Sequence, residues 1–262
     1  MKTLEEMLPR LEALAIEAGV AIMRIYAQDF EPEYKDDYSP VTEADTAAED
    51  IIIAGLQEIA PDIPIVAEEA FSAGHSPDIS GGRFWLVDPL DGTREFVDRN
   101  DEFTVNIALI EDGKPVCGVV HAPALGTTYS GIVGDGAHIR RDGAASQKIS
   151  VRPVPEEGVT VVASRRHGDP KKIAELLEGR SVQETRNAGS SLKFCLVAAG
   201  DADLYPRFGR TMEWDTAAGQ AVLEAAGGRV TRLDGAPFRY AKDGYENPNF
   251  IAWGDLEGPS TG

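Results

Sequence analysis

The chain has 262 residues, and its 44 Asp and Glu residues against 25 Lys and Arg residues give a formal net charge of -19. This excess of acid argues against a nucleic-acid polymer as partner and against attraction to an anionic membrane surface, because both need a basic face. A hydrophobic fraction of 42% is ordinary for a globular protein, and a chain of this length suits one large domain or two closely packed halves.

Two amphipathic helices are predicted first. The capping pattern at Thr3 begins one helix, whose apolar residues recur at helical spacing as far as Ile25. A second helix is predicted from Thr42 to the residue before Pro61, and Asp45 has the spacing of a capping partner for Thr42.

The hydrophobic period then changes to that of strands. The predicted strands are residues 63–67, 84–88, 104–110, 115–121 and 127–133. Asp112 and Gly113 favour a tight hairpin turn, because they readily adopt positive φ angles. Beyond about residue 150, strands and helices alternate, with helices predicted at 170–177, 191–199 and 216–226. We expect two halves, residues 1–150 and 151–262, that share an interface.

No segment of the sequence indicates insertion into a membrane. No apolar run approaches the roughly 18 residues that a spanning helix requires. The first residues carry acid where a secretory signal carries basic residues. We therefore expect a cytoplasmic protein without an integral membrane segment.

The richest candidate site follows the strand predicted at 84–88. Asp88 ends that strand, Pro89 keeps it extended, and a turn that Gly92 permits would bring Asp91 back toward it. Two carboxylates in one small space call for a cation or a shared proton. Hard oxygen ligands without thiolate or imidazole favour Mg²⁺ or Mn²⁺. The alternative is an Asp-rich surface turn.

Three more acids could join this site, although each has a plainer interpretation. Glu68 follows a short apolar strand, but together with Glu69 it would more commonly be solvated. Asp215 lies where the last helix begins, which is the ordinary place for an N-cap. Asp45 could serve only as the capping partner described above.

Four segments, in this order, resemble the inositol monophosphatase family of lithium-sensitive, magnesium-dependent phosphomonoesterases. They are residues 40–45 (Pro-Val-Thr-Glu-Ala-Asp), 68–69 (Glu-Glu), 88–93 (Asp-Pro-Leu-Asp-Gly-Thr) and 214–219 (Trp-Asp-Thr-Ala-Ala-Gly). The resemblance implies an α/β fold with five layers, an αβαβα sandwich, whose site lies between the two halves. It also implies a small phosphate ester as substrate and two or three Mg²⁺ ions, for which Mn²⁺ could substitute. Family members occur as monomers or homodimers, and some associate peripherally with the inner face of the membrane, so both matters stay open.

The resemblance also implies roles for individual residues. The metal ligands would be Glu68, Asp88, the backbone carbonyl of Leu90, Asp91 and Asp215. The catalytic residues would be Asp45, Thr93 and Glu68, with Asp45 and Thr93 orienting and deprotonating the attacking water.

Within the family, four segments resemble the nucleotidases that act on 3′(2′),5′-bisphosphates. They are residues 91–96, 101–110, 189–195 and 204–209. The implied reaction converts 3′-phosphoadenosine 5′-phosphate into AMP and phosphate, with the 5′-phosphosulfate analogue as a second candidate substrate. After Glu69 the chain departs from this subgroup, because Ala70 and Phe71 stand where an Asp-Pro-Pro pattern is usual.

A bisphosphate needs a second anion site. Ser190 and Lys193 are candidates, since hydroxyls and free amides at a helix start, with an ammonium one turn in, suit phosphate. The alternative is a capped helix with a solvent-facing lysine. The implied substrate-binding residues are Leu90, Asp91, Gly92, Thr93, Ser190, Lys193, His167, Arg207 and Asp215.

Two other functions remain open from the sequence. One is an inositol or sugar monophosphatase on the same fold. The other is a phosphate-binding module without catalytic activity, which is disfavoured because every expected catalytic position is filled.

Overall fold

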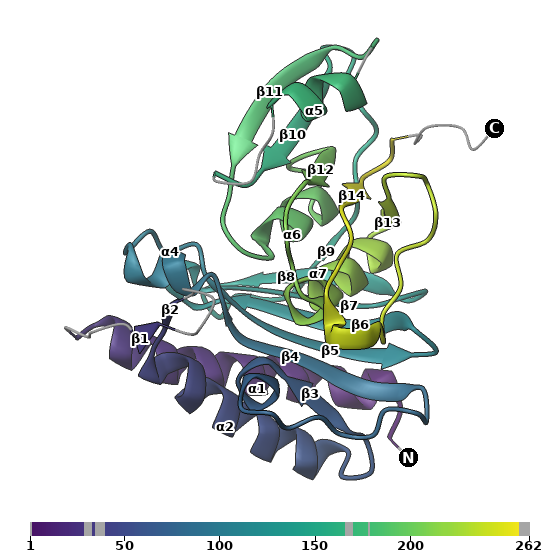
Figure 1. Cartoon of the computed structure of the whole chain (residues 1–262). Helices are drawn as coiled ribbons and strands as arrows, with labels where there is room; N and C mark the ends of the chain where they lie inside the picture. Colours follow the sequence, from purple (N-terminus) through teal and green to yellow (C-terminus); the bar gives the residue numbers. More distant parts are fainter. Residues whose placement is uncertain (1, 29–32, 35–39, 166–169, 178, 257–262) are drawn as a thin grey trace.

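The computed structural model describes residues 2–28, 33–34, 40–165, 170–177 and 179–256. Its helices and sheets stack in five layers, as Figure 1 shows. Two helices cover a seven-stranded sheet, two more helices lie between that sheet and a five-stranded sheet, and a last helix covers the outer face. The αβαβα sandwich predicted from the sequence is confirmed.

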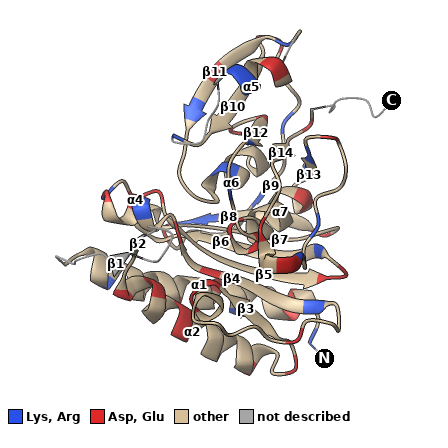
Figure 2. Cartoon of the chain, in the orientation of Figure 1, with Lys and Arg blue, Asp and Glu red and all other residues tan. Residues whose placement is uncertain are grey.

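The outermost layer consists of α1 (Leu4–Tyr26) and α2 (Glu43–Ile59). Both capping boxes predicted from the sequence are present, at Thr3 and at Thr42. The apolar faces of the two helices are fully buried against the sheet, where they pack in one cluster with Trp85. Acidic residues also lie along both helices, so acid is not confined to the site described below (Figure 2).

The first sheet contains two strands that the sequence did not predict, β8 and β9. Its order is β3 (Ile65–Ala67), β4 (Arg83–Asp91), β5 (Thr104–Glu111), β6 (Lys114–Ala122), β7 (Thr127–Ile132), β8 (Gly136–Arg141) and β9 (Gln147–Ile149). Only β3 and β4 run parallel, and every other neighbouring pair is antiparallel. The predicted turn between β5 and β6 is confirmed, with φ of 49° at Asp112 and 72° at Gly113.

Short elements continue the first strands toward the site. The five-residue helix α3 (Glu68–Ser72) follows β3, and α4 (Thr93–Val97) follows β4. A two-stranded ribbon of β1 (Glu33–Tyr34) and β2 (Pro40–Val41) precedes α2. The remaining short helices are η1 (Pro123–Leu125) and η2 (Asp243–Tyr245).

The second sheet is formed by the later part of the chain. Its order is β11 (Val182–Asn187), β10 (Val159–Ala163), β12 (Leu204–Arg207), β14 (Phe250–Trp253) and β13 (Arg229–Arg232). Between the two sheets lie α6 (Leu192–Ala198) and α7 (Glu213–Ala225), and α5 (Pro170–Leu176) covers the outer face (Figure 1). The predicted alternation of strands and helices is confirmed.

Helix α7 lies directly on the first sheet. A Cβ atom at Gly118 of β6 would stand 2.6 Å from the backbone oxygen of Ala218, so only glycine permits this approach. The helix begins at Glu213 rather than at residue 216, which corrects the predicted start. Asp215 therefore lies inside the first turn, where its carboxylate accepts the Met212 N–H at 2.8 Å.

Among the described residues, no helix combines the length and the apolar composition that crossing a membrane requires.

Candidate active site

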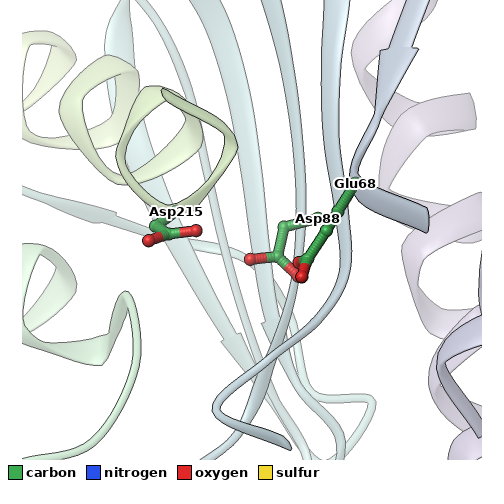
Figure 3. Close-up of side chains that lie close together, drawn as sticks. All are labelled: Glu68, Asp88 and Asp215. Atoms are coloured by element: carbon green, nitrogen blue, oxygen red, sulfur yellow. The ribbon is translucent and has the colours of Figure 1, made fainter. Parts of the chain in front are cut away.

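Three carboxylates from distant parts of the chain meet beside the start of α7. One oxygen each from Glu68, Asp88 and Asp215 lie within 4.8 Å of one another. Glu68 begins α3, Asp88 lies near the end of β4, and Asp215 reaches them from the opposite side (Figure 3). The structure thus brings together three of the acids that the sequence suggested.

Asp91 joins these acids through an irregular end of β4. The strand continues to Asp91 past a break in its register with β5, instead of turning back after Asp88 as predicted. The Leu90 N–H donates to Asp88 Oδ1 at 3.1 Å, which holds the irregular segment. Asp91 lies outside the closest group of three, but its charge still raises the pKa of both Asp88 and Asp215.

The ionised forms of these acids are strongly disfavoured without a cation. Burial raises the pKa of Asp88 well above 3.8, and the charges of Glu68, Asp91, Asp215 and Asp45 raise it further. Burial, then Asp91 and Glu68, likewise raise the pKa of Asp215. Closely spaced oxygen donors, without thiol or imidazole in the group, fit a hard divalent cation such as Mg²⁺ or Mn²⁺.

The raised pKa values of Asp88 and Asp215 predict how the stability of the fold depends on pH. An Asp whose pKa is raised by folding contributes stability below its unfolded pKa, and that contribution is lost as the pH rises through the folded value. We therefore expect the protein in EDTA to unfold at lower temperature as the pH increases from 5.5 to 8.5. Each unit of upward pKa shift corresponds to about 1.4 kcal/mol, and 1 kcal/mol to roughly 2–4 °C in a chain of this size.

Calorimetry across this pH range, in EDTA and in excess Mg²⁺, measures the effect. Mg²⁺ should raise the unfolding temperature more at pH 8.5 than at pH 5.5, because fewer protons then compete for the carboxylates. An unfolding temperature in EDTA that stays level or rises with pH would contradict the expectation.

Asp45 and Thr93 form a hydrogen-bonded pair beside the acids. Asp45 is 2% exposed, and its Oδ2 accepts the N–H and the hydroxyl of Thr42 at 2.7 and 2.9 Å. Its other oxygen, Oδ1, accepts the Thr93 hydroxyl at 3.1 Å. Asp45 is therefore a capping partner and a member of this pair at once. Burial raises its pKa to about 7, against the opposing effect of the Thr42 hydrogen bonds.

The backbone around Thr93 is shaped for this contact. Gly92 precedes α4 with a φ of 91°, and a Cβ atom there would stand 3.3 Å from the carbonyl oxygen of Glu102. The Thr93 hydroxyl also lies 3.2 Å from the carbonyl oxygen of Leu90. Helix α4 begins at Thr93, and this start places the hydroxyl between Leu90 and Asp45.

A cavity of about 240 Å³ opens beside the acids. Glu68, Asp91 and Asp215 line it, together with Ser190 and Arg207. Arg207 is only 9% exposed, and its Nε has no hydrogen-bond partner among the described residues. The same is true of the buried Ser190 hydroxyl. Buried donors without a partner, on residues that line a polar cavity, are groups that a bound anion would satisfy.

The structure contradicts the alternative of a solvent-facing lysine and one detail of the predicted second anion site. Lys193 is 4% exposed and donates to the carbonyls of Ala188 and Ser190 at 3.1 and 2.5 Å. Burial lowers its pKa to about 8. The amide of Gly189 is not free either, because it donates to the Glu102 carboxylate at 2.7 Å. Lys193 still lines the cavity, whereas His167 lies outside the described residues.

Glu49 supports the site and was not predicted from the sequence. Glu49 is 5% exposed on α2, one turn after Asp45, and accepts the N–H groups of Glu69 and Ala70 at 2.8 Å each. It thereby anchors the start of α3, where Glu68 lies. The available signal was its spacing, because Glu49 lies on the same helix face as the buried residues Asp45 and Ile52.

An aromatic cluster connects the two sides of the site. The ring of Phe71 on α3 lies 5.4 Å from the Trp214 ring and 5.2 Å from the Tyr245 ring, measured between centroids. Trp214 directly precedes Asp215, so the cluster ties the helix of Glu68 to the helix of Asp215. Phe71 is where the chain departs from the Asp-Pro-Pro pattern.

Comparisons with known proteins agree with this arrangement. The model of the inositol monophosphatase family matches residues 3–257. The 3′(2′),5′-bisphosphate nucleotidase CysQ of Escherichia coli O157:H7 is 46% identical over 247 residues, which cover 93% of this chain and 98% of the relative. A crystal structure of CysQ from Bacteroides thetaiotaomicron superposes with a TM-score of 0.77 at 37% identity, covering 93% of this chain and 95% of that one.

A more distant solved structure shares the fold. The inositol monophosphatase from Anabaena (Nostoc) sp. PCC 7120 has a TM-score of 0.75 at 27% identity, covering 96% of this chain and 92% of that one. The family match spans nearly the whole described chain, including every acid of the cluster. The chain therefore belongs to the inositol monophosphatase family.

Proposed function

We propose that this chain is a 3′(2′),5′-bisphosphate nucleotidase that releases phosphate from 3′-phosphoadenosine 5′-phosphate, leaving AMP. The observation that carries the proposal is the cavity, which is lined both by acids, Glu68 and Asp215 of the cluster among them, and by Ser190 and Arg207, whose side chains have unsatisfied donors. A substrate with two separate phosphates would use both. The curated relatives named above support this choice, as does their coverage of 93% of the chain.

The carboxylates would hold the metal ions of the reaction. We assign this role to Glu68, Asp88, Asp91, Asp215 and the Leu90 carbonyl, with two or three Mg²⁺ ions that Mn²⁺ could replace. Bound divalent ions would supply neutralisation of the phosphoryl charge and a lowered pKa for a coordinated water. The chain itself positions the oxygen atoms that would coordinate the ions, and it excludes solvent from Asp88, which is 1% exposed.

Asp45 and Thr93 would move the proton of the attacking water. The Thr93 hydroxyl already donates to Asp45 Oδ1, so its oxygen can accept a proton as its own proton passes to the carboxylate. A threonine hydroxyl is too weak an acid to ionise alone, and the buried carboxylate provides the acceptor. Both roles are part of the proposal, as is a further catalytic contribution of Glu68.

The other phosphate would lie against Arg207 and Ser190. A guanidinium suits a phosphate because its N–H groups are arranged in a planar fork. Lys193 would contribute its positive charge and hold the turn at residues 188–190, rather than contact the phosphate with all three protons. The 5′-phosphosulfate analogue also carries anionic groups at its 3′ and 5′ positions and is the second candidate substrate.

The competing functions leave part of this arrangement unused. A simple inositol or sugar monophosphate has no second anion for Arg207 and Ser190. A binding module without catalysis would have no use for the hydrogen bond between Thr93 and Asp45. A cytoplasmic location, and a monomer or homodimer, stay predictions from the sequence and the family resemblance.

The test is a comparison of two substrates with the wild type and with Arg207→Gln. We expect the wild type with Mg²⁺ to release phosphate from 3′-phosphoadenosine 5′-phosphate far faster than from inositol 1-phosphate. Arg207→Gln should lower kcat/KM for the bisphosphate by roughly 10- to 150-fold, since charged hydrogen bonds contribute about 1.5–3 kcal/mol. The effect on inositol 1-phosphate should stay within about threefold, because that substrate lacks the second anion.

Because the family is lithium-sensitive, Li⁺ added to the same assay should lower the rate of phosphate release.

The substrate comparison decides between the proposed functions. Inositol 1-phosphate as the better substrate would overturn the nucleotidase proposal in favour of the monophosphatase. Absence of Mg²⁺-dependent turnover on either substrate would favour the binding module. Equal losses on both substrates in Arg207→Gln would remove this residue from the second anion site.

A further inference from the structure

The Ser191 hydroxyl connects two of the acids in a way that the roles assigned so far do not use. Ser191 is 1% exposed at the start of α6. Its Oγ lies 2.8 Å from Asp91 Oδ2 and 2.8 Å from the backbone oxygen of Asp215. A hydroxyl has one proton, so these two oxygens share one donor. The contact joins the end of β4 to the first turn of α7.

Asn106 completes the arrangement from the first sheet. It lies on β5 with no exposed surface, and its Nδ2 donates to Ser191 Oγ at 2.8 Å and to Asp91 Oδ2 at 3.3 Å. Its Oδ1 is buried with no partner among the described residues. An unsatisfied buried amide oxygen opposes stability, so stability alone does not explain an Asn at this position.

Both side chains act on the same oxygen of Asp91. Oδ2 is contacted by Ser191 and Asn106, whereas Oδ1 receives no side-chain hydrogen bond from the described residues. Two contacts on one oxygen fix the rotation of the carboxylate. The second contact of Ser191, with the Asp215 backbone, also fixes the separation between Asp91 and α7.

We propose that Ser191 and Asn106 are a positioning pair, which orients Asp91 as a metal ligand and sets its distance from Asp215. This inference rests on the metal-binding role assigned to Asp91 above. Ligands that are held in place before an ion arrives bind it more tightly, and loss of such supporting partners typically weakens metal binding or activity by roughly 10- to 100-fold.

The experiment titrates Mn²⁺ into the purified full-length chain and measures affinity by calorimetry. We expect Ser191→Ala to bind Mn²⁺ roughly 10- to 100-fold more weakly than the wild type. In phosphate-release assays, the metal concentration needed for half-maximal activity should rise, whereas kcat at saturating metal should fall much less. Ser191→Thr keeps the hydroxyl and should restore most of the affinity.

Ser130→Ala is the matched control. Ser130 is 2% exposed, and its hydroxyl also donates to a carboxylate, Glu12 Oε1, at 2.6 Å. That bond joins β7 to α1, on the opposite face of the sheet from α7, so its loss should lower stability without changing Mn²⁺ affinity. Equal Mn²⁺ affinities in Ser191→Ala and wild type would overturn the inference, as would equal losses in Ser191→Ala and Ser130→Ala.

Asn106→Leu is an independent test if Ser191→Ala does not fold. It removes the donor and keeps the volume, and it should weaken Mn²⁺ binding in the same direction. Unchanged affinity in this variant would count against the pair. Failure of the wild type itself to bind Mn²⁺ would instead overturn the proposed metal site, so the two failures are distinguishable.

Discussion

Asp88→Asn is expected to lower Mg²⁺-dependent phosphate release by roughly 10³-fold, the upper range for losing one strong electrostatic contact to a reacting group. The amide keeps the volume of the carboxylate and retains an oxygen that can accept the Leu90 N–H, now bonded at 3.1 Å. It removes a negative charge from a site where burial and four neighbouring carboxylates already raise the pKa. The variant should therefore fold normally and yet fail to hold the ions.

Stability measurements separate this explanation from simple damage. In EDTA at pH 8, Asp88→Asn should unfold at the same temperature as the wild type or a higher one, because like-charge repulsion is reduced. Its gain in unfolding temperature on adding Mg²⁺ should be much smaller. Asp135→Asn, at an exposed position between β7 and β8, should change neither activity nor the response to Mg²⁺. Full activity of Asp88→Asn would remove Asp88 from the metal centre.

Thr93→Val is expected to lower kcat by roughly 10²- to 10⁴-fold, the range typical of lost general acid-base catalysis. Valine reproduces the shape of threonine but cannot donate to Asp45 Oδ1, a contact of 3.1 Å in the structure. Asp45 would then have no hydroxyl through which to reach the attacking water. KM and Mn²⁺ affinity should change little, since the acids of the cluster keep their positions.

A second Thr→Val substitution provides the control. The Thr231 hydroxyl accepts the Trp253 indole N–H at 2.9 Å, in the second sheet. Thr231→Val should lose this bond and leave kcat within about twofold, as expected of a change remote from the reacting atoms. A kcat for Thr93→Val that matches this control would contradict the relay, and a large loss of Mn²⁺ affinity would show a metal-binding role instead.

Features set by short-range patterns were predictable from the sequence. The capping box at Thr42 and the turn at Asp112 depend only on residues close in the chain, and both are confirmed. The acids at Asp88 and Glu68 could be identified because each follows a buried strand, where unpaired charge needs an explanation. The order of the motifs then supplied the family and the fold.

Features that depend on contacts across the chain were not predictable in this way. Asn106 occupies an ordinary strand position, and only the approach of α6 brings Ser191 to it. The sequence left open whether Lys193 faces an anion site or solvent, and only the packing of α6 shows that it is buried beside Tyr205, whose ring lies 5.3 Å from its ammonium. The irregular end of β4 was likewise invisible, because it appears only when β4 pairs with β5.

The division of the acids among distant elements has a consequence for how the protein assembles. Glu68 and Asp88 belong to early elements of the chain, whereas Asp215 belongs to α7, which a ribosome produces much later. Until α7 packs against β6 at Gly118, the early acids have no buried counterpart opposite them. Docking of α7 therefore adds the charge of Asp215 to the repulsion that Glu68 and Asp91 already exert on Asp88. A divalent ion would accelerate or stabilise that late step of folding, rather than the formation of the first sheet.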